Sequence, residues 1–242
     1  MNRLGFSTGA LAKGDFARGV TLQETSGATA VELSALREHE LPVLVDHWRH
    51  LDLSRFEYVS VHAPSKLANG DGALLESLAS FPEGWPVVAH PEVLKNENEW
   101  RRLGARLCIE NMDVRKTTGR TTEELRVLFQ RFPEARFCLD LGHARQVDPT
   151  MATALHMIRA FGDRLVQIHV SEVGPQGEHL PISALAAAEL RLVTVHVPQD
   201  CAVIIESVVT ESQIDRELRV VQNLFAPETE DRFSISEAAA AH

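Results

Sequence analysis

Eight short apolar segments rich in β-branched residues recur along the chain, and polar stretches with helical periodicity separate most of them. Most of the segments are nearly continuous in their hydrophobicity rather than alternating, which is typical of strands that are covered on both faces in a parallel sheet. The sequence therefore predicts eight strands, at 4–8, 29–36, 58–64, 85–91, 105–111, 136–142, 165–172 and 201–208.

Three of the intervening stretches carry clear helix signals. Residues 121–132 begin with a threonine followed by two glutamates, and residues 149–161 place Pro149 near the first helical position. Residues 211–225 put Ile214, Leu218 and Val221 on one helical face. Residues 41–51 and 72–81 are also predicted helices, whereas the Gly-rich stretch 9–28 predicts only a short or distorted one.

The repeat of strand and helix at intervals of about 30 residues predicts the fold. The chain has 242 residues, close to the ~250 of a typical β/α barrel. We expect a single (β/α)8 TIM barrel over residues 1–226, followed by a flexible polar C-terminal tail at 227–242. A doubly wound open sheet is the alternative, but no Gly-rich dinucleotide fingerprint follows the first strand.

Composition narrows the possible partners. The net charge of −10 provides no basic surface for a phosphate backbone, so we expect a small-molecule substrate rather than nucleic acid. No apolar run is long enough for a signal peptide or a membrane span, so we expect a cytoplasmic protein. The three cysteines lie in apolar runs and are predicted to be buried hydrophobic residues, namely Cys108, Cys138 and Cys201.

Candidate chemistry lies where the predicted strands end. Almost every strand from the third onward ends in histidine, aspartate or glutamate, and in a β/α barrel the carboxyl ends of the strands all face one site. Each residue alone has a plainer interpretation, as a hydrogen-bonded core histidine or a buried ion-pair partner. Together they predict a divalent-metal centre, built from His62, His90, Glu110, Asp140, His143, His169 and Glu206. The histidines at 39, 47, 50, 156 and 196 are interpreted as structural or surface residues.

Several motifs occur in an order that carries a family resemblance. HAPS (62–65), AHPE (89–92), CIENMD (108–113), CLDLGHARQ (138–146), IHVSE (168–172), GEHLPIS (177–183) and IIES (204–207) resemble the xylose isomerase-like TIM-barrel superfamily. That superfamily includes sugar phosphate isomerases and epimerases and endonuclease IV. The resemblance covers strands three to eight, roughly two-thirds of the chain.

The resemblance implies roles for individual residues. In the isomerase branch one metal would be held by Glu110, Asp140, His169 and Glu206, with His143 touching a substrate oxygen. In the endonuclease IV branch a second metal would use His62, His90 and a bridging Glu110. A third would use His143 and an Asp-x-His motif; His179 matches that motif, but Gly177 stands at the position of its aspartate.

These roles lead to three functional hypotheses. The first is a metal-dependent isomerase or epimerase that acts on a small sugar, sugar phosphate or hydroxy-carbonyl compound through an enediolate. Glu110 and Glu206 would exchange protons, and the ion would be Mn²⁺, Mg²⁺ or Co²⁺. The second is an endonuclease IV-like hydrolase with two Zn²⁺ ions. The third is a metal-binding barrel without catalysis.

Four cationic side chains could bind a substrate phosphate. They are Lys66, Arg115, Lys116 and Arg145, of which we single out Lys66 and Arg145 as substrate-binding residues beside His143. Solvated surface positions are the plainer interpretation of such loop cations.

Overall fold

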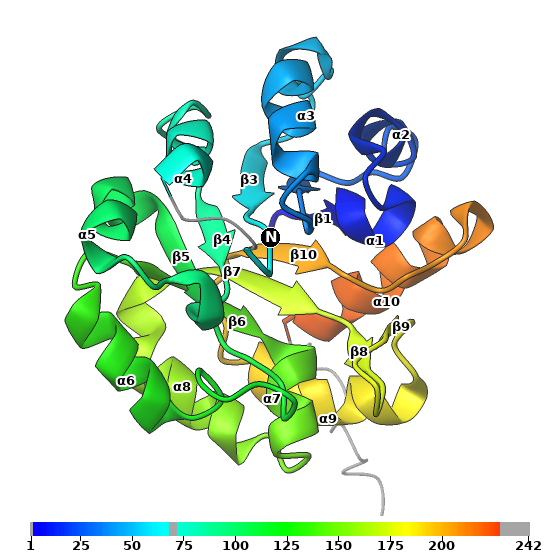
Figure 1. Cartoon of the computed structure of the whole chain (residues 1–242). Coiled ribbons are helices and arrows are strands. Elements are labelled where there is room, and N and C mark those ends of the chain that lie inside the picture. Colours follow the sequence, from blue (N-terminus) through cyan, green and yellow to red (C-terminus); the bar gives the residue numbers. More distant parts are fainter. Residues whose placement is uncertain (1, 68–71, 228–242) are drawn as a thin grey trace, which may run out of the picture.

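A computed structural model of the chain describes residues 2–67 and 72–227. Eight parallel strands form a closed barrel in the order β1-β10-β7-β6-β5-β4-β3-β2, and helices surround it (Figure 1). The fold is the predicted (β/α)8 TIM barrel. Its strands are β1 Leu4–Ser7, β2 Ala30–Ser34, β3 Tyr58–His62, β4 Val87–Ala89, β5 Leu107–Glu110, β6 Arg136–Asp140, β7 Leu165–Val170 and β10 Ala202–Ile205.

The helices that follow the strands are short, and several are extended by a turn of 3-10 helix. The α-helices are α1 Thr8–Ala12, α2 Phe16–Thr21, α3 Glu40–His47, α4 Gly72–Ala79, α5 Glu97–Trp100, α6 Thr122–Arg131, α7 Leu141–Val147, α8 Ala152–Phe161, α9 Ala184–Thr194 and α10 Ile214–Phe225. The 3-10 turns are η1 Trp48–His50, η2 Pro91–Val93, η3 Arg101–Arg106, η4 Gly162–Arg164 and η5 Glu211–Gln213. No helix among the described residues is both long and apolar enough to cross a bilayer.

Strand burial explains the continuous apolar runs. The outward side chains of the strands pack against the helices and the inward ones fill the barrel, so both faces are covered. All four residues of β10 are buried, for example. The three cysteines are buried and unpaired, as predicted.

Several boundaries differ from the predictions. The helix predicted at 149–161 begins at Ala152 rather than at Pro149, because Met151 adopts a left-handed conformation with φ 62°. The strand predicted at 136–142 ends at Asp140, where α7 begins at once. The stretch 9–28 forms two short helices, α1 and α2. The predicted C-terminal tail lies outside the described residues, apart from Pro227.

Several elements were not predicted, among them helices α5, α7 and α9 and a small hairpin. Helix α9 is Ala-rich and begins after Ser183, whose side chain caps it by accepting from the Ala186 amide. A small antiparallel hairpin, β8 (Glu172–Val173) and β9 (His179–Leu180), follows β7. The hairpin places His179 beside the carboxyl ends of the barrel strands.

Candidate metal centre

The predicted site residues converge on one end of the barrel. A cavity of about 580 Å³ opens there, and its walls include Glu110, His143, Glu206 and the rings of three further histidines, His62, His90 and His179. Asp140 and His169 are fully buried. Each contacts a residue of the cavity wall, because Asp140 lies next to His143 and His169 lies next to Glu110. The convergence predicted from strand ends is therefore present.

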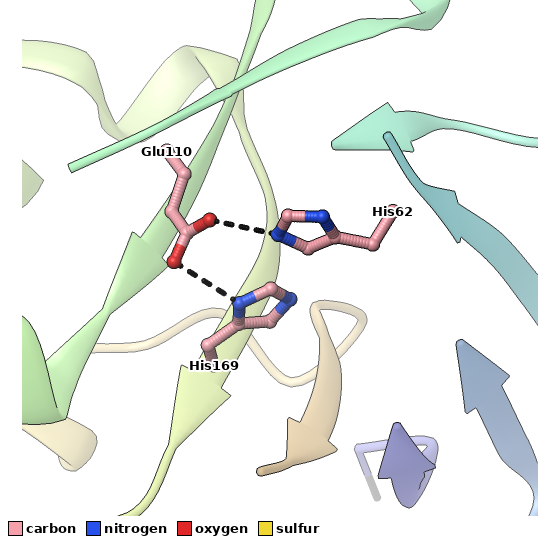
Figure 2. A group of neighbouring side chains, drawn as sticks. All are labelled: His62, Glu110 and His169. Atoms are coloured by element: carbon pink, nitrogen blue, oxygen red, sulfur yellow. Dashed lines mark hydrogen bonds and ion pairs between the residues drawn. The ribbon is translucent and has the colours of Figure 1, made fainter. Parts of the chain in front are cut away.

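Glu110, at the end of β5, is the centre of the cluster. Its Oε2 atom lies 3.2 Å from Nε2 of His62 and 3.2 Å from Nε2 of His90. Its Oε1 atom lies 3.3 Å from Nδ1 of His169 and 3.3 Å from Nδ1 of His143. Figure 2 shows the carboxylate facing the rings of His62 and His169, with one oxygen directed at each. The two oxygens of one carboxylate thus face two different sets of side chains.

Asp140 links the site to the start of α7. Its Oδ1 atom accepts a hydrogen bond of 2.7 Å from the backbone amide of His143, which caps the helix. Its Oδ2 atom is buried and accepts no hydrogen bond within the described residues, although Nδ1 of His143 lies 3.3 Å away. Burial of a carboxylate oxygen is unfavourable without a partner, so this orphan oxygen fits a metal ligand.

His169 is held from the barrel interior by two residues that the sequence analysis did not single out. Glu32, on β2, places Oε2 3.1 Å from Nε2 of His169. The Gln167 amide nitrogen lies 2.6 Å from the same Nε2 and donates to Glu32 at 2.7 Å. The opposite ring nitrogen, Nδ1, faces Glu110 and lies 3.5 Å from Oε1 of Glu206. A histidine braced in this way on one nitrogen and directed at carboxylates with the other is typical of a metal ligand.

The hairpin completes the cluster on the side of β10. Nδ1 of His179 lies 2.9 Å from the hydroxyl of Ser171 and 3.4 Å from Oε2 of Glu206. The rings of His143 and His179 are 5.6 Å apart and nearly perpendicular. His179 is therefore at the site, as the sequence pattern predicted.

Mutual contacts set the protonation of the cluster. Burial would lower the pKa of His62, but Glu110 and Glu32 raise it to about 9. Burial also opposes protonation of His143, yet Asp140 and Glu110 raise its pKa to about 10. Burial raises the pKa of Asp140 to about 7. In Glu110, burial is outweighed by the surrounding histidines, which hold the pKa of its carboxyl well below the usual value.

Two groups of side chains have the spacing that a metal ion requires. The ligand atoms within each group lie within 4.8 Å of one another, in the sets Glu110, Asp140, His169, Glu206 and His62, Glu110, His169. The first set is the predicted mononuclear site. His90 approaches Glu110 from the side of His62, and its Nδ1 has no hydrogen-bond partner among the described residues. The donor set is of the kind that zinc and manganese accept.

The cationic candidates separate into two groups. Lys66, Arg115 and Lys116 line the cavity. Arg145 does not appear in its walls, because its guanidinium pairs with Glu189 at 2.5 Å and approaches Glu172 at 3.8 Å. The Arg145 side chain therefore does not reach the cavity, where the substrate-binding role predicted for it would require it to lie.

Further buried polar residues support the site. Asn111 holds β6 in place, since its side chain donates to the Asp140 carbonyl and accepts from the Asp140 amide. Asp113 is 1% exposed and lies 3.8 Å from Nε2 of His143. Both follow Glu110 within the CIENMD motif, in which only Glu110 was predicted to belong to the site. The five histidines interpreted as surface residues are all exposed.

The closed barrel and its rim of histidines and carboxylates together define a β/α barrel with a candidate metal site. Solved structures with the same fold include endonuclease IV from Thermus thermophilus, at 23% identity and a TM-score of 0.61, covering 92% of this chain and 98% of that one. A xylose isomerase domain protein from Alicyclobacillus acidocaldarius is 14% identical, with a TM-score of 0.65 and coverage of 93% and 98%.

A third similar structure is described as a putative sugar phosphate isomerase/epimerase from Anabaena variabilis. It is 12% identical, with a TM-score of 0.60, and covers 90% of this chain and 88% of that one. No protein-family model and no curated protein sequence matches the chain. At these identities the likeness concerns the fold, which is the one that the sequence resemblance predicted.

Proposed function

We propose that the protein is a metal-dependent hydrolase of phosphoesters on small molecules. The observation that carries the proposal is the shared carboxylate of Glu110, whose two oxygens face His62 and His90 on one side and His143 and His169 on the other. A carboxylate whose two oxygens each face a pair of histidines could bridge two divalent ions. An isomerase that uses one ion has no need for His62 and His90 as further ligands.

The residues divide into two half-sites. We define the inner half-site as Glu110, Asp140, His169 and Glu206, and the outer half-site as His62, His90 and Glu110. Divalent ions held there would polarise a phosphoryl group and lower the pKa of a water molecule. The protein side chains would fix the position of the phosphoester between them.

Glu206 is placed to handle protons in this reaction. Its carboxylate is 13% exposed, forms part of the cavity wall and contacts both His169 and His179. Such a group can accept a proton at the cavity surface and pass it to His179. Lys66 and Lys116 lie in the same wall. Lys66 would offset phosphate charge, whereas Lys116 is paired with Glu92 at 2.6 Å.

The size of the cavity argues for a small substrate. A volume of about 580 Å³ falls within the ~300–1,000 Å³ of typical small-molecule sites. The acidic net charge of −10 opposes binding of a nucleic acid duplex. We therefore favour a phosphorylated metabolite over the DNA substrate that the name endonuclease IV implies for the Thermus protein.

A second candidate, the isomerase or epimerase that the sequence analysis placed first, is supported by a different contact. Oε1 of Glu110 and Oε1 of Glu206 both face Nδ1 of His169, at 3.3 and 3.5 Å. Two carboxylates next to one ion-binding point could remove and return a proton on substrate carbon. The inner half-site alone would support this chemistry.

A paired assay separates the two candidates. Protein loaded with Zn²⁺ or Mn²⁺ would be incubated with aryl phosphomonoesters and phosphodiesters, and separately with ketoses and ketose phosphates in deuterated water. Hydrolysis that is lost in His62→Ala supports the first proposal. Deuterium incorporation that survives His62→Ala and is lost in Glu206→Gln supports the second. The variant His156→Ala, at an exposed position on α8, is the control for both.

A further inference from the structure

Arg115 ties two loops together at the rim of the cavity. Its backbone amide and its Nε donate to Oδ1 of Asp113, at 2.7 and 3.0 Å, and its Nη2 donates to Oδ2 at 2.6 Å. Its Nη1 donates to the carbonyl of Gln176, at 2.5 Å, in the turn of the β8–β9 hairpin. The guanidinium is therefore fixed in place by a buried carboxylate on one loop and by backbone on the other.

The guanidinium also occupies the space next to Gly177. A Cβ atom built on Gly177 would overlap the Cζ and Nη atoms of Arg115, so the guanidinium would have to leave this position to admit a side chain there. The backbone of Gly177 has φ +85°, a conformation that also disfavours residues with a Cβ. Arg115 and Gly177 are thus fitted to each other, and a carboxylate at position 177 is excluded while Arg115 holds this position.

This packing explains the departure from the Asp-x-His pattern. His143 and His179 lie close together, whereas the carboxylate of Glu178, in the turn that precedes His179, accepts a hydrogen bond from the Gln176 amide and is not part of the cavity wall. Asp113 approaches Nε2 of His143 at 3.8 Å, and the oxygen that does so is the one to which Arg115 donates. Arg115 therefore brings a positive charge next to the carboxylate oxygen that approaches this histidine pair.

We propose that Arg115 replaces a third metal ion and binds a phosphoryl oxygen of the substrate. The centre then contains two divalent ions and one guanidinium. This inference rests on the proposed function for the identity of the substrate class, but its geometric part stands on Arg115, Asp113 and Gly177 alone.

The guanidinium has donors left for this role. It carries five N–H groups, and the side-chain hydrogen bonds to Asp113 and Gln176 use three of them. Two N–H groups therefore remain without an acceptor among the described residues. The side chain is 43% exposed and lines the cavity. A planar guanidinium with two free N–H groups is suited to paired contacts with a phosphoryl group.

The first test counts metal ions, which needs no enzymatic turnover. Wild type and Arg115→Ala, saturated with Zn²⁺ and freed of excess ion, should each retain two ions per chain by elemental analysis. The double variant Arg115→Ala with Gly177→Asp, which removes the guanidinium and supplies the carboxylate, should retain three. Three ions in the wild type, or two in the double variant, would overturn the replacement.

The second test measures binding of inorganic phosphate to the Zn²⁺-loaded protein by calorimetry. Arg115→Ala should weaken phosphate binding at least tenfold, and Arg115→Lys should fall between it and wild type because the charge remains without the paired donors. The control is Arg120→Ala, since Arg120 also pairs with a nearby carboxylate, Glu124, but lies outside the cavity wall.

The outcomes separate this inference from the proposed function. Unchanged phosphate affinity in Arg115→Ala overturns it, whether or not the wild type hydrolyses phosphoesters. Loss of affinity in Arg115→Ala together with an ion count of two supports it, even if the hydrolysis assay fails with every substrate tested. Arg115→Lys keeps the test informative if Arg115→Ala does not fold.

Discussion

Oε2 of Glu32 lies 3.1 Å from Nε2 of His169, on the opposite side of the imidazole from Glu110. Both residues are fully buried. A carboxylate behind a metal-binding histidine fixes its ring orientation and raises its basicity. Glu32 is therefore a positioning residue for the inner half-site, although it faces the barrel interior and is absent from the cavity wall.

The first prediction concerns this pair. Glu32→Gln keeps the shape of the side chain but removes the charge behind His169, so Zn²⁺ affinity should fall about 10–100-fold. Competition with a chromophoric chelator measures the affinity. Glu40→Gln is the matched control, because Glu40 is also buried but contacts Arg37 on the outer side of the barrel. Equal affinity in Glu32→Gln and wild type would remove Glu32 from any role at the centre.

The second prediction concerns Asp140, which combines a candidate ligand with a helix cap. Asp140→Ala should abolish retention of the inner ion, and the stabilisation that the ion gives to the wild type should be lost with it. Thermal unfolding with and without Zn²⁺ measures both effects. Wild type and His156→Ala should be stabilised by the ion. An unchanged ion count in Asp140→Ala would exclude it as a ligand.

The third prediction concerns the pH dependence of metal binding. The pKa values of about 9 for His62 and about 10 for His143 mean that both rings are protonated at neutral pH without an ion. Ligation requires the neutral ring, so binding must release protons and affinity should rise from pH 7 to pH 9. Calorimetry in buffers of different ionisation enthalpy gives the number of protons released. Release of none at pH 7 would contradict the prediction.

The fourth prediction concerns Asp148, before α8. Its carboxylate accepts hydrogen bonds from the side chains and amides of Thr150 and Thr153, which lower its pKa to about 2. A lowered pKa means that the ionised form stabilises the native state. This contribution is complete above the unfolded value of about 4 and is lost as the pH falls through about 2.

Asp148→Ala should therefore lower the free energy of unfolding by about 1 kcal/mol at pH 7, since Asp148 is only partly buried. The difference from wild type should shrink at pH 3. Urea unfolding at the two pH values measures it. Asp163→Ala is the control, because Asp163 is exposed and its carboxylate accepts no hydrogen bond within the described residues. A difference that grows at pH 3 would contradict the assignment.

The sequence was sufficient for the fold and for the convergence of the strand-end histidines and carboxylates. Continuous apolar runs indicate strands that are covered on both faces. The polar residue at the end of each run indicates a side chain at the carboxyl end of the barrel. Glu32 was missed although the same rule applies to it, since it is a charged residue inside the apolar run TAVELSAL. Its role depends on facing inward toward a residue 137 positions away.

Other features could not be derived from sequence spacing. Two-residue strands such as β8 and β9 carry no periodicity, so the hairpin that presents His179 leaves little local signal. The direction of Arg145 depends on Glu189, which lies on a different helix. The fit of Arg115 against Gly177 likewise joins positions that are distant in sequence, and only the folded chain brings them together.

The position of Glu110 has a consequence for how the centre would fill. One carboxylate belongs to both half-sites, so an ion that binds to one oxygen withdraws negative charge from the other. Occupancy of the two half-sites is then coupled, and by thermodynamic reciprocity each ion alters the affinity for its neighbour by the same factor. Titration with Zn²⁺ would deviate from two independent and identical sites, and replacement of this single residue would disable both at once.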